Sequence, residues 1–270
     1  MIGSLTDPTG SVIPLPRKPL RIVSTVPSQT ELLVDLGLEE ELVVITAYCV
    51  HPKSLLSRKT IIGGTKNLQL DRIRSLKPDL IIGNKEENIK EQIEGLQQDF
   101  PVWISDIRTV DDALKMISDT GILTHREKKS EEILKKITHE RNKLQAAPSL
   151  RVAYLIWKEP FMLAGHDTFI GNMLNECGLK NVAPKGKERY PAVDLEGLKN
   201  LQPDLILLSS EPYSFTTSDA HIMAGQILQT LVKIVDGELF SWYGSRMKSA
   251  FQYFQVLCNE LKLSFSQNIQ

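Results

Sequence analysis

The stretch that decides the fold is LDRIRSLKPDLII at residues 70–82, and a related stretch, LEGLKNLQPDLIL, follows at residues 195–207. Each copy predicts a short helix with an acid in its first turn, a Pro-Asp pair that ends the helix, and an apolar run of strand length. A strand that is apolar at every position is typical of a parallel sheet covered by helices on both faces. We therefore expect an α/β lobe around each copy.

Other segments repeat in the same order around these two copies. RIVS at residues 21–24 and RVAY at residues 151–154 each predict the first strand of a lobe, and Gly37 and Gly178 end the helices that follow. The fold class is therefore two three-layer α/β lobes, joined by a single long helix, with an interlobe cleft where a ligand would bind. The expected parts are an N-terminal lobe at 1–124, a connecting backbone helix at 125–147 and a C-terminal lobe at 148–270, with a last helix from Ser245 to Leu261.

Composition excludes several classes of protein. The 270 residues, 41% hydrophobic and 24% charged, suit a globular chain with two cores, and a net charge of -1 gives no attraction to nucleic acid or an anionic membrane. No apolar run is long enough to predict a membrane span. Residues 1–19 lack the pattern of a secretory signal, so the protein is either cytoplasmic as written or a periplasmic or envelope protein whose signal was removed. Cys49, Cys177 and Cys258 are odd in number and far apart, so we expect no disulfide framework.

Two loops of the first lobe carry versatile side chains. PSQTE at residues 27–31 predicts a helix start with Ser28 as the cap three residues before Glu31, and its backbone NH groups either favour an anionic ligand group or simply begin a helix. Cys49 and His51, two residues apart, would share one side of an extended strand. They indicate either a metal or haem contact, or a buried thiol beside a hydrogen-bonded histidine. Without a second cluster of such residues we predict no metal site.

The order of these segments resembles the helical-backbone (class III) substrate-binding proteins of ABC importers, and among them the vitamin B12 and ferric siderophore receptors. The resemblance covers residues 5–262, and its most specific parts are the PSQTE turn and the repeated PDLI unit. One branch of the family shares the CVHP, GGTKN and WYGSR segments of this chain, which begin at residues 49, 63 and 242.

The resemblance implies a ligand in a shallow cleft between the lobes and a set of residues that contact it. Two acids, Asp71 and Glu196, would dock on arginines of the permease. His51 and Lys66 join the ligand set because they follow strands. The full set is Pro27, Ser28, Tyr48, His51, Gly64, Thr65 and Lys66 in the first lobe, and Trp157, Phe161, Arg189, Tyr190, Phe240, Trp242, Tyr243 and Arg246 in the second.

Departures from the B12 receptors make the first-lobe side of the expected cleft more polar. Thr65 stands where those receptors carry a tryptophan that stacks on the corrin, and charged residues surround it, which favours a smaller or more charged chelate. His125 and His139 fall on the connecting helix, so the histidine set of manganese and zinc receptors is absent. The second lobe supplies aromatic rings, of which we expect about half to be core, with Phe169, Phe251 and Phe254 structural.

We expect Trp242 to stack on a partly anionic ligand and Arg246 to pair with its carboxylate, although exposed salt bridges are an equal alternative for the arginines. The leading hypothesis is a monomeric binding protein that is no enzyme, holds no covalent cofactor, and captures cobalamin, haem or a ferric siderophore for an ABC permease. The alternative is a cytoplasmic enzyme or metallocofactor-handling protein that uses Cys49, His51, Glu86 and Glu211. No hydrolase motif supports that alternative.

Overall fold

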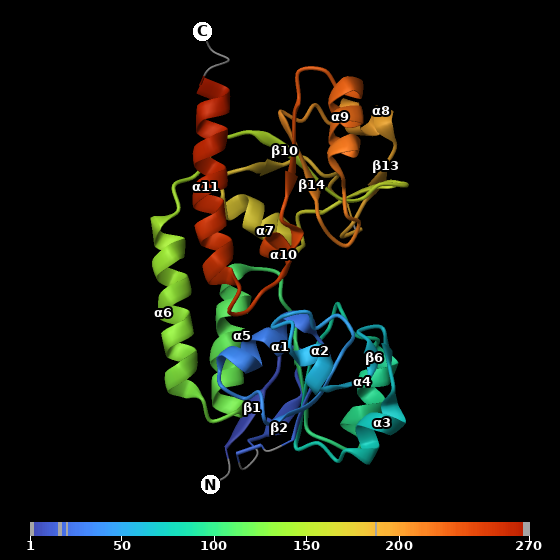
Figure 1. The fold of residues 1–270 in the computed structure, drawn as a ribbon, viewed down its shortest axis with the longest axis vertical. Helices are drawn as coiled ribbons and strands as arrows, with labels where there is room; N and C mark the ends of the chain where they lie inside the picture. The colour runs from blue at the N-terminus through green and yellow to red at the C-terminus, as the bar shows by residue number, and fades with distance from the viewer. Residues whose placement is uncertain (1–2, 16–17, 20, 187, 267–270) are drawn as a thin grey trace. The chain divides into compact units, whose positions relative to one another are not determined.

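The computed structural model describes residues 3–15, 18–19, 21–186 and 188–266. These residues form two compact units, each with its own sheet (Figure 1). Unit 1 holds the chain up to Ile107 together with Asp111–Thr138 and Tyr243–Arg246, and unit 2 holds Arg108–Val110, His139–Trp242 and the chain from Met247. The predicted α/β class is confirmed, whereas the domain boundaries at 124/125 and 147/148 remain a prediction.

The sheet of unit 1 has five parallel strands in the order β5-β4-β3-β8-β9. Parallel pairing explains why β8 reads as an unbroken apolar run, since helices cover both faces of such a sheet. The strands are β3 (Ile22–Ser24), β4 (Leu42–Ile45), β5 (Thr60–Ile61), β8 (Leu80–Asn84) and β9 (Val102–Ser105). The helices are α1 (Pro27–Asp35), α2 (Leu55–Arg58), α3 (Leu70–Ser75), α4 (Lys90–Gln97) and α5 (Val110–Leu123).

Two hairpins complete unit 1. The first pairs β1 (Ser4–Thr6) antiparallel with β2 (Val12–Pro14), and a shorter one joins β6 (Gly63–Gly64) to β7 (Asn67–Leu68). Asp7 organises the first hairpin: its Oδ1 accepts from the backbone N of Thr9 at 2.9 Å, and its Oδ2 accepts from the backbone N of Ile104 at 3.2 Å. The hairpin is thereby tied to the edge strand β9, which would otherwise offer unpaired backbone groups.

The sheet of unit 2 has six strands: β10 pairs in parallel with β12 and β14, β14 pairs in parallel with β15, and β11 pairs antiparallel with both β10 and β13. The strands are β10 (Arg151–Trp157), β11 (Phe161–Leu163), β12 (Lys180–Asn181), β13 (Ala192–Val193), β14 (Leu205–Ser209) and β15 (Leu231–Val235). The helices are α7 (Phe169–Glu176), α8 (Leu195–Asn200), α9 (Thr217–Gln226), α10 (Gly237–Ser241) and α11 (Met247–Ser266).

The repeated stretch forms the same helix and strand in each unit. In unit 1 the backbone N of Arg21 donates to Asp79 Oδ2 at 3.0 Å, and Arg21 Nε donates to the carbonyl of Leu76 at 2.7 Å. In unit 2 the backbone N of Arg151 donates to Asp204 Oδ2 at 2.7 Å. The Pro-Asp pair therefore does more than end a helix, because its carboxylate pairs with the residue that leads into the neighbouring first strand.

The long helical pattern that begins near Arg126 is confirmed as α6 (Glu127–Lys143), which contributes residues to both units. The last predicted helix is α11, which lies beside α10 and α7 in Figure 1. Its buried residues include Phe251 and Phe254, and Phe169 is buried on α7, so the structural role expected of these three rings is confirmed.

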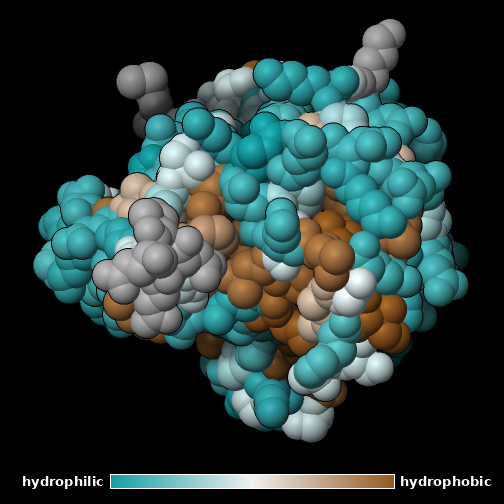
Figure 2. All heavy atoms as spheres, turned by 90° about the horizontal axis from the view of Figure 1, so that it is seen from above, coloured by the Kyte–Doolittle hydropathy of each residue, from teal (hydrophilic) through white to brown (hydrophobic). Residues whose placement is uncertain are grey.

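Among the described residues, no helix is long and apolar enough to cross a membrane. On the face that Figure 2 displays, apolar residues are flanked by hydrophilic ones.

Candidate functional site

Buried amides and hydroxyls gather where β3, β8 and β9 of unit 1 end. Asn88 Oδ1 accepts from Thr25 Oγ1 and from the backbone N of Asn84, both at 2.9 Å. Ser105 Oγ accepts from Gln29 Nε2 at 2.6 Å and from Asn84 Nδ2 at 3.0 Å. Every member of this network is buried, so each of these hydrogen bonds replaces one to water and the network holds the loops rigidly.

Gly83 is required where this network passes β8. A Cβ at Gly83 would lie 2.7 Å from Asn88 Oδ1 and 2.8 Å from Thr25 Oγ1. Any side chain there would displace the amide from its partners.

The network fixes the loop that carries the predicted ligand residues of unit 1. Asn88 Nδ2 donates to the carbonyl of Thr65 at 3.0 Å, and Lys66 Nζ donates to the carbonyl of Glu86. Tyr48 contacts Gly64, since a Cβ on that glycine would lie 3.0 Å from Tyr48 Cε2. Tyr48 is 62% exposed, so unit 1 presents an aromatic ring to solvent. The ring lies beside the Gly64-Thr65 backbone, which the hydrogen bond from Asn88 holds in place.

The PSQTE segment departs from our expectation. Helix α1 begins at Pro27, its N-cap is Val26 without a side-chain cap, and Ser28 lies buried inside the first turn. The capping prediction for Ser28 and Glu31 is therefore wrong. Glu31 instead accepts from Arg246, with Oε2 2.8 Å from Nε and Oε1 2.7 Å from Nη2. Burial raises the pKa of Glu31 and the arginine offsets part of that rise.

Tyr243 and Arg246 have polar groups engaged within unit 1. Tyr243 Oη donates to Glu87 Oε1 at 2.8 Å, and burial raises the pKa of this tyrosine, with the Glu87 charge adding to the rise. Gly244 has φ +106°, a conformation that L side chains rarely adopt. The guanidinium of Arg246, which we expected to meet a ligand carboxylate, thus already has a bidentate carboxylate partner in the protein.

Cys49 and His51 do not lie on an extended strand, so the geometry that we assumed for a shared metal contact is wrong. Cys49 is in a turn after β4, where its backbone N donates to the carbonyl of Thr46 at 3.2 Å. Its buried thiol lies 3.1 Å from Thr30 Oγ1, and burial raises its pKa. His51 is half-buried and precedes Pro52. No group of three or more metal-ligating side chains occurs in the described part of the chain.

In unit 2, aromatic rings follow β10 and β14. Trp157 is 40% exposed and meets Tyr213 edge to face with ring centroids 5.7 Å apart, and Tyr213 meets Phe215 at 4.8 Å. Next to them Lys158 Nζ lies 2.8 Å from Asp219 Oδ1, and this hydrogen bond lowers the pKa of Asp219 to about 2. The three rings form a row from the buried Phe215 through Tyr213 to Trp157. The partly exposed indole of Trp157 could stack on a ligand.

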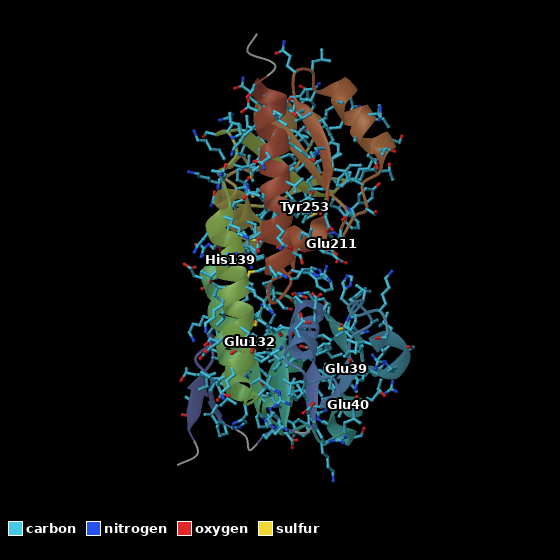
Figure 3. The ribbon with its side chains drawn as sticks, turned by 60° about the vertical axis from the view of Figure 1, so that its left-hand side comes forward. Glu39, Glu40, Glu132, His139, Glu211 and Tyr253 are labelled. Atoms are coloured by element: carbon cyan, nitrogen blue, oxygen red, sulfur yellow. The ribbon has the colours of Figure 1, made fainter. Side chains whose placement is uncertain are left out.

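Glu211 follows β14 and organises the start of the WYGSR segment (Figure 3). Its Oε1 accepts from Ser241 Oγ at 2.7 Å and from Trp242 Nε1 at 3.1 Å, and burial raises its pKa. Trp242 is buried, and Phe240 is fully buried with its ring 5.0 Å from that of Tyr154. Phe240 therefore serves the core of unit 2.

The remaining predicted ligand residues of unit 2 are Arg189, Phe161 and Tyr190. Arg189 Nε donates to the carbonyl of Asp167 at 2.7 Å, and Arg189 lines a cavity of about 320 Å³ together with His166. Phe161 on β11 and Tyr190 are half-buried. The ligand-binding set as a whole remains a prediction.

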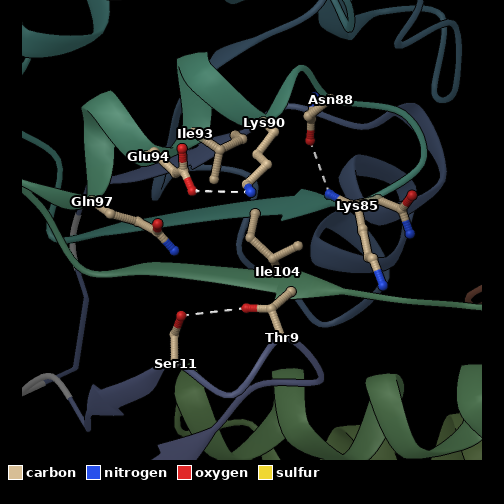
Figure 4. A pocket seen from close by; sticks show the side chains of 10 residues that line it. Thr9, Ser11, Lys85, Asn88, Lys90, Ile93, Glu94, Gln97 and Ile104 are labelled. Carbon is tan, nitrogen blue, oxygen red and sulfur yellow. Dashed lines mark hydrogen bonds and ion pairs between the residues drawn. The ribbon is translucent and has the colours of Figure 1, made fainter.

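A larger cavity of about 530 Å³ lies in unit 1 between the first hairpin and α4 (Figure 4). Lys90 and Glu94 form an ion pair at its rim with Nζ 3.6 Å from Oε1, and no predicted ligand residue lines it.

The two acids that the resemblance assigned to permease docking have equivalent positions in the repeat. Asp71 lies in the first turn of α3 and Glu196 in the first turn of α8. Both side chains are largely exposed, and each meets a cation on its own helix, Arg74 at 3.5 Å and Lys199 at 2.8 Å.

Sequence reasoning missed the buried network of Thr25, Gln29, Asn84, Asn88 and Ser105. A usable signal was present, because each apolar run of the first sheet ends in a small polar residue: Ser24-Thr25, Gly83-Asn84 and Ser105.

The family model for periplasmic binding protein matches residues 22–232. A vitamin B12-binding protein of Pectobacterium carotovorum is 24% identical over 250 residues, which cover 90% of this chain and 88% of the relative. The structure of the periplasmic vitamin B12 binding protein BtuF of Vibrio cholerae superposes with a TM-score of 0.76 at 21% identity, covering 91% of this chain and 98% of that one.

The periplasmic heme-binding protein BhuT in complex with two hemes superposes with a TM-score of 0.74 at 20% identity, covering 90% of this chain and 97% of that one. At these identities the two structures show a shared fold. The family model spans most of the chain, from the start of β3 in unit 1 into β15 in unit 2. The protein therefore belongs to the periplasmic binding protein family.

Proposed function

We propose that the protein captures a metal chelate of the corrinoid, haem or ferric siderophore type and delivers it to an ABC permease. The observation that carries the proposal is the family match over residues 22–232, together with relatives named for vitamin B12 and heme. Such ligands are broad and partly apolar, with anionic or polar edges, so exposed aromatic faces and fixed polar groups would bind them.

Each unit offers its own candidate contacts. In unit 1, Tyr48 exposes a ring beside the Gly64-Thr65-Lys66 loop, which Asn88 holds in place. In unit 2, Trp157 exposes an indole face at the end of β10. These two rings are better candidates than Trp242 and Arg246, whose polar atoms pair with Glu211 and Glu31.

The proposal extends to partner, place and assembly. The protein works in the cell envelope as a monomer, and Asp71 and Glu196 contact basic residues of the permease. It is no enzyme: of the reactive groups in the alternative hypothesis, the buried thiol of Cys49 lies 3.1 Å from Thr30 Oγ1, and the half-buried carboxylate of Glu211 accepts from Ser241.

Calorimetric titration with cyanocobalamin, haemin and a panel of ferric siderophores tests the proposal. We expect one chelate to bind at micromolar concentration or below, with Tyr48→Ala and Trp157→Ala each weakening it by about 10-fold, the effect of losing one stacking face. Leu228→Ala is the control, because Leu228 is also an exposed apolar residue but does not belong to the predicted ligand set. Failure of every chelate to bind would favour a role outside import.

A further inference from the structure

We propose that Cys177 and Cys258 form a disulfide that fastens the last helix, α11, to the end of α7. Cys177 is the C-cap of α7 and Cys258 lies in the middle of α11, so the bond would join two elements of unit 2 that are 81 residues apart in sequence. This proposal is independent of the ligand and of the proposed function.

The geometry brings the two thiols together. Cys258 Sγ lies 3.8 Å from the carbonyl oxygen of Cys177, so the side chain of Cys258 contacts the residue that ends α7. Both cysteines are fully buried, and a disulfide needs two cysteines whose backbones already lie this close together. Cys49, the third cysteine, belongs to unit 1, where its thiol lies beside Thr30 and Thr46.

The neighbours of the two cysteines show which parts of unit 2 the disulfide would hold together. The carbonyl of Cys177 accepts from the backbone N of Ala147 at 2.8 Å, so the chain that leads into β10 meets the end of α7 at this point. On α11, Phe254 packs on Phe240 with ring centroids 4.6 Å apart. A covalent link at Cys258 would keep the whole C-terminal helix docked on this core, even where its last turns fray.

The chemistry balances with a small-molecule or protein disulfide as the oxidant. The two thiols exchange with a disulfide RSSR to give the Cys177–Cys258 bond and two molecules of RSH, so two thiols are oxidised as one external disulfide is reduced. The interaction with Cys258 and burial raise the pKa of Cys177, while the interaction with Cys177 lowers the pKa of Cys258. Both residues are fully buried, so an external disulfide reaches them slowly once the protein has folded. Oxidation therefore occurs during folding, before α11 closes over the pair.

Thiol counting on the whole chain tests the proposal without any variant. The protein is refolded in a buffer of oxidised and reduced glutathione, then unfolded and alkylated without reductant. We expect a single alkylated cysteine, Cys49, and a peptide pair joined through Cys177 and Cys258. Three alkylated cysteines, or a bond that includes Cys49, would overturn the proposal.

Thermal melts with and without reductant measure the effect on stability. We expect reduction to lower Tm by roughly 5–10 °C, because the bond closes a long loop in the unfolded chain. Cys177→Ala and Cys258→Ala should melt at the same temperature in both buffers, whereas Cys49→Ala should keep the difference. If the difference persists in Cys258→Ala, the stabilising bond is not the one proposed.

Discussion

The two copies of the repeat are alike at the amino ends of their strands and different at the carboxyl ends. At the amino ends of the strands, Asp79 and Asp204 accept from the backbone N of Arg21 and Arg151 in the same way. Lys77 and Gln202 even share a positive φ, 46° and 45°, before their prolines. The amino ends keep these hydrogen bonds in both units, because the turn from helix to strand needs them.

The carboxyl ends have diverged instead. Unit 1 places amides and hydroxyls there, with Asn88 at the centre of a buried network, whereas unit 2 places a row of rings that ends in Trp157. Loops at this edge carry function in α/β folds and can change without unfolding the sheet. The same supersecondary unit therefore supplies a polar surface in one copy and an aromatic surface in the other.

Among the polar contacts, the largest expected effect is the loss of the ion pair between Arg246 and Glu31. Arg246→Ala should lower the free energy of unfolding by about 2–4 kcal/mol at neutral pH, because it leaves the partly buried Glu31 carboxylate without its partner. Urea unfolding measures the loss. The double variant Arg246→Ala with Glu31→Gln is the control and should recover part of it, since no charge remains buried. A single variant as stable as the parent would show that Arg246 is available to a ligand.

The same pair predicts how stability depends on pH. The pKa of Glu31 is raised above its ordinary value of 4.5, so the folded state binds this proton more tightly than the unfolded state does. Protonation of Glu31 therefore stabilises the protein below that value, and this contribution is lost as pH rises through the folded pKa. Without Arg246 the pKa rises further, so the defect of Arg246→Ala should be small at pH 4 and grow towards pH 7. A defect that is constant with pH would contradict this account.

Smaller effects are expected when the side-chain hydrogen bonds at the carboxyl ends of the strands are removed in each unit. Asn88→Ala in unit 1 leaves Thr25, the backbone N of Asn84 and the carbonyl of Thr65 without their partner and should cost about 2–3 kcal/mol. Ser209→Ala in unit 2 removes a hydroxyl that joins Tyr154 Oη, 3.1 Å away, to Glu211 and should cost about 1 kcal/mol. Equal costs by urea unfolding would mean that the two edges are equally dependent on polar contacts.

The amino edges should respond alike. Asp79→Ala and Asp204→Ala each remove one carboxylate that accepts from a strand backbone, so we expect similar losses of about 1–2 kcal/mol. Asp71→Ala serves as the control, because this acid on α3 is fully exposed and pairs with Arg74 on its own helix. Losses that differ several-fold would show that the two copies are not equivalent structural units.

The smallest expected effect is that of Trp157→Ala on stability. Trp157 is 40% exposed and its indole meets the Tyr213 ring edge to face, so the melting temperature should fall by a few degrees at most. Phe240→Ala is the contrast, since it removes a fully buried ring and should cost about 3–5 kcal/mol. A large loss for Trp157 would make it part of the core and remove it from the ligand proposal.

The sequence by itself determined the repeat, the α/β class and the helices and strands that carry them. Those features depend on neighbours in the chain, such as the apolar run at 80–82 and the Pro-Asp pair before it. It also determined the structural role of Phe251 and Phe254, because their spacing places them on one face of α11.

Only the tertiary structure decided what the polar residues of the candidate site do. Glu31 and Arg246 are 215 residues apart, so no local pattern could predict that they pair with each other. Cys177 and Cys258 meet only because α11 packs on the end of α7, which is why spacing along the chain gave no sign of a disulfide. Local periodicity specifies secondary structure, whereas the partner of a buried charge or thiol depends on which distant element packs against it.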